Sequence, residues 1–122
     1  MNKNPLNMGN DLRCGDFMNS NNNKYKATLQ PDGNFVLILT SSGATKWETK
    51  TSNEGGQRLV MQKNCNLVLY DDDNTCVWSS NSTQSGPVNC YLESCDDGYL
   101  KICNKGKEVW RSNPDSNKSV LS

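Results

Sequence analysis

The sequence lacks histidine: none of its 122 residues is a His. Histidine is the commonest general base, the side chain that titrates near neutral pH and the most frequent zinc ligand. Its absence excludes the Ser-His-Asp type of hydrolytic triad and the familiar His-containing zinc sites. No set of Ser, Cys or paired carboxylates stands out in its place. We therefore expect a binding protein and not an enzyme, with no metal and no cofactor.

The chain also lacks a charge excess of either sign and lacks long apolar runs. Thirteen basic residues balance 13 acidic ones, so its field draws neither nucleic acid nor an anionic membrane. No apolar run reaches the length of a membrane span, and the start, MNKNPLNMGNDLRCGDF, lacks the apolar stretch of a signal peptide. We expect no nucleic-acid partner, no membrane insertion, and a chain that is either mature or leaderless.

Six cysteines are present in this short chain, which favours disulfides and an oxidising compartment. We expect an extracellular, secreted protein; a cytoplasmic or leaderless protein stays open as the alternative. No Cys-x-x-Cys pair suggests zinc. The acidic runs at Asp71 and Asp96 lack the later Glu of an EF-hand calcium loop. We predict that both runs are turns.

Three tryptophans, Trp47, Trp78 and Trp110, lie 31 and 32 residues apart. The segments LQPDGNFVLIL, MQKNCNLVLYD and ESCDDGYLKIC precede them, and each Trp is followed by a polar stretch. A fixed period of this size indicates three copies of one structural unit. Alternating short runs with turn residues and no helical period predict an all-β domain with threefold internal symmetry and the Trp side chains in its core. The alternative is that the tryptophans are unrelated interior aromatics.

We assign the whole chain, 1–122, to one domain, because its length suits a single core. The repeat units cover approximately 25–55, 56–87 and 88–114, and a polar tail covers 115–122.

Each of the first two units places one polar row on a strand face, because alternate residues of a strand point to the same side. Amides and carboxylates offer donors and acceptors together, which suits a neutral polyhydroxylated ligand such as a sugar. The alternative interpretation is an ordinary solvated outer face. The rows are Gln30, Asp32, Asn34, Val36 and Ile38 in unit one, and Gln62, Asn64, Asn66, Val68 and Tyr70 in unit two.

Unit three can be aligned in two ways. Matching Gly98 to Asn66 would bury Lys101, whereas matching Asp97 and Gly98 to Asp32 and Gly33 buries apolar residues instead and shortens a loop. We prefer the second alignment, because burying an unpaired lysine costs more than trimming a surface loop. Its row then reads Cys95, Asp97, Tyr99, Lys101 and Cys103.

The pattern QxDxNxVxY, repeated with a Trp after each copy, resembles the signature of the monocot mannose-binding lectins, the bulb-type or snowdrop-like family. Nearly the whole chain takes part in this resemblance. Relatives also occur in fish skin mucus, fungi and bacteria, and an animal member of the mucus type is compatible with the pattern. The resemblance implies a β-prism II fold of three four-stranded antiparallel sheets around a pseudo-threefold axis. It also implies a homodimer that exchanges C-terminal strands near Trp110.

The resemblance further implies mannose binding without metal. In the family the Gln binds the 3-hydroxyl, the Asp and Asn the axial 2-hydroxyl, and the Tyr the 4-hydroxyl, while the Val packs on the ring. Unit one retains Gln30, Asp32, Asn34 and Val36 but has Ile38 at the Tyr position. Unit two retains Gln62, Asn66, Val68 and Tyr70 but has Asn64 at the Asp position. In unit three only Asp97 matches, so two imperfect sites are expected.

The resemblance also suggests disulfides. "NCNLVLYD" followed by "VNCYL" matches the family segment in which Cys65 and Cys90 are bonded. Cys95 and Cys103 occupy the Gln and Tyr positions of unit three, which reach adjacent hydroxyls, so we predict a bond between them. The four remaining cysteines allow three pairings, and the sequence does not choose among them. A Cys14–Cys76 bond follows by elimination, unless one of these two cysteines links two subunits.

These observations predict a lectin for mannose-containing glycans or glycoproteins, acting in recognition or defence. The alternative is a lectin-fold protein with degenerate sites that serves as a protein-interaction or structural module.

Overall fold

The computed structural model describes residues 1–113, and the predicted polar tail, 115–122, lies outside them. It contains twelve β-strands and no helix in this range. No helix long and apolar enough to cross a membrane is therefore found among these residues. The strands are β1 (Leu6–Asn7), β2 (Asp11–Arg13), β3 (Phe17–Asn19), β4 (Tyr25–Leu29), β5 (Phe35–Leu39), β6 (Thr45–Glu48), β7 (Arg58–Met61), β8 (Leu67–Tyr70), β9 (Cys76–Ser79), β10 (Cys90–Ser94), β11 (Leu100–Asn104) and β12 (Lys107–Arg111).

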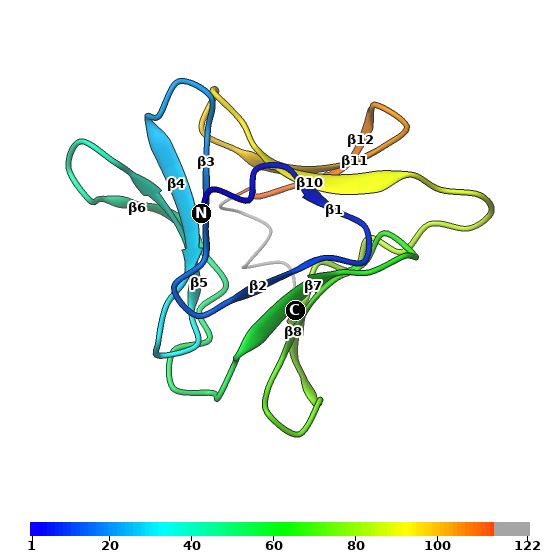
Figure 1. Cartoon of the computed structure of the whole chain (residues 1–122), viewed down its shortest axis with the longest axis horizontal. Helices are drawn as coiled ribbons and strands as arrows, with labels where there is room; N and C mark the ends of the chain where they lie inside the picture. Colours follow the sequence, from blue (N-terminus) through cyan, green and yellow to red (C-terminus); the bar gives the residue numbers. More distant parts are fainter. Residues whose placement is uncertain (114–122) are drawn as a thin grey trace.

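The strands form three antiparallel four-stranded sheets around a central axis (Figure 1). The first sheet has the order β3-β4-β5-β6, the second β2-β7-β8-β9 and the third β1-β10-β11-β12. Each sheet takes three consecutive strands from one repeat unit and its fourth strand from the N-terminal segment. This segment visits the third, second and first sheets in turn. The arrangement confirms the all-β prism of three four-stranded sheets that the sequence predicts.

Every sheet repeats the same irregularity next to its tryptophan. Trp47 pairs with Leu37 and Trp78 with Leu69, and in both hairpins the register shifts immediately beyond the apolar partner. The third hairpin does the same around Trp110. Such β-bulges bend a strand and increase its twist.

The core lies inside the three sheets, where alternate strand residues point inward. Trp47 packs edge-to-face against Trp78 and Trp110, with both centroid distances 5.7 Å, and the latter two rings lie 6.1 Å apart. Edge-to-face packing of this kind is favourable beyond simple burial. Only Trp47 is fully buried, at 4% exposure, while Trp78 and Trp110 are partly buried against the core. The tryptophans thus form one central cluster and are not scattered.

The third sheet confirms the preferred alignment of unit three. Leu92, Leu100 and Ile102 are fully buried, and Lys101 lies on the outer face. Strand β12, which carries Trp110, pairs with β11 of its own chain. An exchange of this strand between two subunits stays a prediction, because pairing within one chain does not test how two chains associate.

Candidate functional site

Each sheet positions its polar row with the same turn at the start of the middle strand of the hairpin. In the first sheet, the Gln30 amide donates to the Asn34 carbonyl at 2.9 Å, and the Asn34 amide donates to Asp32 Oδ1 at 3.0 Å. The position of Asp32 therefore has a structural task, which an Asn can perform equally well through its own Oδ1. The same two bonds recur at Gln62, Asn64 and Asn66 in the second sheet and at Cys95, Asp97 and Tyr99 in the third.

Site two, the row on the second sheet, is anchored by Asn66. Its Oδ1 accepts from the Ser80 hydroxyl at 3.3 Å and from the Ser82 amide at 3.2 Å. These bonds fix the orientation of the side-chain amide. Its Nδ2 has no hydrogen-bond partner within residues 1–113, so this donor is available to a ligand.

The side chains of Gln62 and Tyr70 meet across the same face of the second sheet. Gln62 Nε2 donates to Tyr70 Oη at 2.5 Å. Val68 lies on the same face of β8 as Tyr70 and is only 4% exposed, so it forms an apolar floor beneath these two side chains. The Arg58 guanidinium covers the Tyr70 ring, with its Cζ 5.1 Å from the ring centroid. Site two thus joins Gln62 to Tyr70 over Val68, and Asn64 and Asn66 lie in the turn that precedes β8.

Site one, on the first sheet, has the same anchor but a different far end. Asn34 Oδ1 accepts from the Thr49 hydroxyl at 3.0 Å and from the Thr51 amide at 3.2 Å. Val36 forms the floor at 3% exposure. At the far end stands Ile38, which has no hydroxyl, so Gln30 lacks the bond that Gln62 makes with Tyr70.

Glu48 belongs to site one, although the sequence pattern did not indicate it. Its Oε1 accepts from Asn34 Nδ2 at 3.0 Å, and thus occupies the donor that is available on Asn66 in site two. Glu48 pairs with Val36 across β5 and β6, and the equivalent partner of Val68 is Ser79. This contact follows from the pairing of β5 with β6, and a pattern of residues along β5 alone does not predict that pairing.

Site three is filled by its own charged side chains. Lys101 Nζ lies 2.8 Å from Asp97 Oδ2, and Arg111 covers the Tyr99 ring at 4.6 Å. Arg111 also bonds Glu108 at 2.8 Å. The hydrogen bond from Lys101 lowers the pKa of the Asp97 carboxyl. The pKa of Lys101 is raised by the same contact. The charged groups are therefore paired with one another, and this row contains no side-chain amide that could bind a sugar.

One of the three predicted disulfides is present. Cys65 and Cys90 are bonded, with a Cα–Cα distance of 5.5 Å. This bond joins the turn of the second sheet to the first strand of repeat unit three. The other four cysteines, Cys14, Cys76, Cys95 and Cys103, are free thiols.

The predicted Cys95–Cys103 bond is wrong. Cys95 lies opposite Tyr99, whereas Cys103 lies opposite Tyr91, four residues further along β11. Four residues of strand span about 13 Å, far beyond the Cα separation of roughly 4.4–6.8 Å that a disulfide permits. Gln62 and Tyr70 meet across the same positions only because their side chains are long. Burial raises the pKa of the Cys95 thiol to about 12, so this sulfur stays protonated.

The predicted Cys14–Cys76 bond is wrong as well. Strands β2 and β9 form opposite edges of the second sheet. Arg13, the neighbour of Cys14, is separated from Cys76 by a cross-strand row through Arg58 and Tyr70. Three strand spacings amount to about 14 Å.

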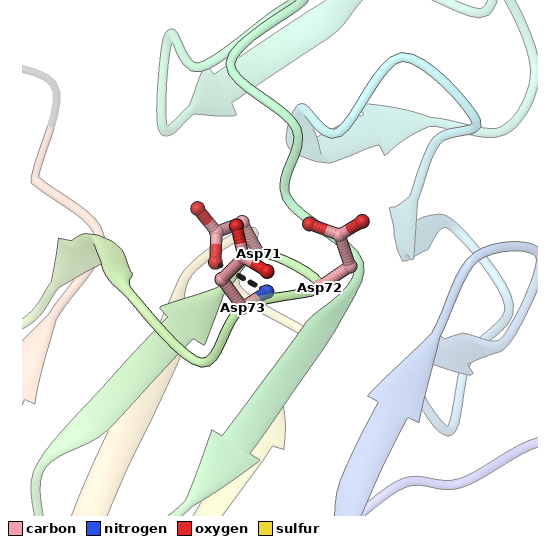
Figure 2. Close-up of side chains that lie close together, drawn as sticks. All are labelled: Asp71, Asp72 and Asp73. Carbon is pink, nitrogen blue, oxygen red and sulfur yellow. Dashed lines mark hydrogen bonds between the residues drawn. The ribbon is translucent and has the colours of Figure 1, made fainter.

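The acidic run at Asp71 is a turn, as predicted. Asp71, Asp72 and Asp73 follow β8 and hold their carboxylates within 4.8 Å of one another (Figure 2). Asp71 Oδ1 accepts from the amides of Asp73 and Thr75, at 2.9 and 2.8 Å. This carboxylate therefore serves the turn. Asp96, in the other acidic run, accepts from the Asn22 amide at 2.9 Å.

Comparison with known proteins assigns the family. The chain is 34% identical over 115 residues to the B-type lectin plumieribetin of Scorpaena plumieri, which covers 94% of this chain and 97% of that protein. The chain belongs to the B-type lectins. No family model matches the sequence of this lectin. Over a shorter range of 59 residues it is 46% identical to the mannose-specific lectin TAR1 of Colocasia esculenta, which covers 48% of this chain but only 24% of the plant protein.

Solved structures show the same fold. This B-type lectin matches the monomeric monocot mannose-binding lectins from Gastrodia elata with a TM-score of 0.80 at 27% identity, over 90% of this chain and 96% of the other. It matches the mannose-specific agglutinin of snowdrop (Galanthus nivalis) bulbs, solved with methyl α-D-mannoside, with a TM-score of 0.73 at 29% identity, over 82% and 88% of the two chains. The β-prism II fold is thereby confirmed.

Proposed function

We propose that this lectin binds mannose-type glycans without a metal ion, through site two foremost and through site one more weakly. The observation that carries the proposal is the composition of site two. Gln62 and Tyr70 bracket an apolar floor at Val68, and Asn66 presents an unpaired Nδ2 above a fixed turn. Hydroxyl groups of a sugar match such a set of donors and acceptors. Relatives named for mannose specificity support the choice of sugar.

The function we propose is binding and not catalysis. The chain has no histidine, and the relatives are lectins. A role in recognition or defence would use several weak sites together, because linking sites raises avidity by orders of magnitude when geometry permits. We accordingly propose a secreted homodimer. The Cys65–Cys90 disulfide supports an oxidising compartment. Light scattering on a sizing column tests the dimer.

A second candidate is a lectin-fold protein without sugar binding that serves as a protein-interaction or structural module. Glu48 in site one and the charged pairs of site three favour it, because both occupy positions that a sugar would need.

A glycan array with the purified protein separates the two functions. The array is run with and without EDTA and with free mannose as competitor. We expect binding to mannose-terminated glycans that EDTA does not change and that free mannose displaces. Silence across the array would reject the lectin function in favour of the module, and binding lost with EDTA would reject independence from metal.

A further inference from the structure

The loop between the first and second sheets is hydrogen-bonded to both candidate sites. This bridging loop, residues 49–57, carries the chain from β6 to β7 (Figure 1). The Asn53 amide donates to the Asp32 carbonyl at 2.7 Å, and the Gln57 amide donates to the Tyr70 carbonyl at 2.8 Å. Asp32 belongs to site one and Tyr70 to site two. The backbone of one short segment therefore connects the two rows.

The bridging loop is held rigidly against the turn of site one. A Cβ on Gly33 would lie 2.8 Å from the Gly56 nitrogen, and a Cβ on Gly56 would lie 2.9 Å from the Gly33 carbonyl oxygen. Gly33 also has φ 88°, which glycine adopts without strain. Only two glycines allow backbones to approach so closely. Thr51 Oγ1 adds a bond to the Gly33 carbonyl at 2.9 Å. The backbone of the loop is thus fixed relative to the turn of site one.

Two pockets flank this loop and share one side chain. The first, about 310 Å³, adjoins site one through Asp32 and also contains Asn53 and Gln57. The second, about 320 Å³, contains Gln57 and Arg58, and Arg58 covers the Tyr70 ring of site two. Pockets of this size lie at the lower end of the range that small ligands occupy. Gln57 lines both pockets, so they adjoin at this side chain, with Asp32 of site one in the first and Arg58, beside Tyr70 of site two, in the second. We call the two adjoining pockets the path between the sites.

The chemistry of the path suits a neutral, polyhydroxylated ligand. The first pocket offers two carboxamides, from Asn53 and Gln57, together with the Asp32 carboxylate. In the second pocket the cations are balanced, because Asp71 and Asp72 line it together with Arg13 and Arg58. Such a set contains donors and acceptors without a net positive field, so it does not select for an anionic glycan.

We infer that the bridging loop and its two pockets join sites one and two into one extended surface for a neutral oligosaccharide, with Asn53 and Gln57 contacting sugar residues beyond the terminal mannose. This inference rests on the proposed function and names its ligand class: a mannose oligosaccharide and not a single terminal mannose. Two side-chain amides lie along the path, and each hydrogen bond to a sugar hydroxyl changes affinity by roughly two- to tenfold.

Calorimetric titration with soluble ligands tests the inference without the avidity of a surface. The ligands are methyl α-mannoside and linear mannose di-, tri- and pentasaccharides. The protein is the full chain and three variants: Gln57→Ala, Asn53→Gly and the control Asn89→Ala. Asn53 has φ 64°, so glycine retains the backbone there, and alanine at position 57 retains the amide that bonds Tyr70. Asn89 is an exposed amide that immediately precedes β10 of the third sheet and lines neither pocket.

We expect the unaltered protein to bind the longer oligosaccharides roughly tenfold or more tightly than methyl α-mannoside. Gln57→Ala and Asn53→Gly should each reduce this gain roughly two- to tenfold while leaving the affinity for methyl α-mannoside unchanged. Asn89→Ala should leave both affinities unchanged. Thermal unfolding of each variant checks that it is folded.

Two results would overturn the inference alone. One is equal affinity for methyl α-mannoside and the longer oligosaccharides; the other is a gain with length that neither loop variant reduces. Failure of every mannose ligand to bind would instead overturn the proposed function, and the inference with it.

Discussion

Glu48 accepts a hydrogen bond from Asn34 Nδ2 at 3.0 Å, and this contact distinguishes site one from site two. In the second sheet the equivalent strand position is Ser79, and Asn66 Nδ2 has no partner within residues 1–113. A sugar hydroxyl at site one must therefore compete with a carboxylate of the protein itself. The two rows look alike as sequences but differ in the donor that they offer.

Replacing Glu48 should strengthen site one. Glu48→Ser, which copies Ser79, releases Asn34 Nδ2 and should raise the affinity of site one for methyl α-mannoside roughly two- to tenfold. Calorimetric titration in a Gln62→Ala background, in which site two is impaired, isolates the effect. Glu93→Ser removes a carboxylate from the third sheet and serves as the control. An unchanged or reduced affinity after Glu48→Ser would show that Glu48 does not obstruct the site.

Tyr70→Phe should weaken site two. The change removes the hydroxyl that accepts from Gln62 at 2.5 Å while leaving the ring under Arg58. We expect methyl α-mannoside affinity to fall roughly two- to tenfold and stability to fall by about 1 kcal/mol, measured by calorimetry and denaturant unfolding. Tyr99→Phe, on the filled third face, should leave sugar affinity unchanged. Full affinity in the Tyr70 variant would remove this residue from the site.

Exchanging the residues at positions 32 and 64 should move affinity in opposite directions. Both side chains hold the turn through Oδ1, at 3.0 Å, and either Asp or Asn can do so. Only Asp adds a charged acceptor, and charge-assisted hydrogen bonds are roughly twice as strong as neutral ones. Asn64→Asp should therefore strengthen site two and Asp32→Asn weaken site one, with little change in Tm. If each variant bound methyl α-mannoside with the affinity of the unaltered protein, the second carboxylate oxygen would make no contact with the sugar.

The threefold repeat made the fold predictable from the sequence. The tryptophan period and the alternating rows are local features, and each identifies the buried face of its own hairpin. The N-terminal segment was harder, because its three strands, β1, β2 and β3, are only two or three residues long. Runs so short carry no periodicity, and they become strands only by pairing with β10, β7 and β4.

The site was predictable along each strand but not between strands. Gln62 and Tyr70 appear in one row, and the structure brings them together. Glu48 escaped notice because it lies on the neighbouring strand beyond a β-bulge, where spacing in sequence does not report proximity. The predicted Cys95–Cys103 pair failed for a related reason: side-chain length decides which positions can meet, and the row pattern ignores it.

The Cys65–Cys90 bond should contribute substantially to stability. It closes a separation of 25 residues, and the loop-entropy estimate for that length is about 3–4 kcal/mol. The double variant Cys65→Ser, Cys90→Ser should lose that amount in denaturant unfolding, while Cys14→Ser should lose little, since its sulfur is exposed. Thiol titration of the unfolded, unreduced protein should give four free thiols. Fewer than four would mean that another pair is oxidised.

The Lys101–Asp97 pair should make stability depend on acid pH. The pKa of Asp97 lies below its ordinary value of 3.8 because Lys101 donates to it, so the pair stabilises the folded state above that value. The contribution disappears as the pH falls through the lowered pKa, because the carboxyl is then protonated in both states. Asp97→Asn should accordingly lower Tm at pH 7 by an amount that vanishes toward the acid end of the series.

The effect of Asp97→Asn should be small, because the Asp97 side chain is 50% exposed and such pairs contribute less than about 1 kcal/mol. The same substitution in a Lys101→Gln background provides the control, since the group that lowers the pKa of Asp97 most is then absent. The difference in Tm between Asp and Asn at position 97 should be nearly independent of pH in that background. A pH-dependent difference of the same size with and without Lys101 would assign the lowered pKa to another group. The amide of Tyr99, which donates to Asp97 Oδ1 at 3.2 Å, is the donor to test next.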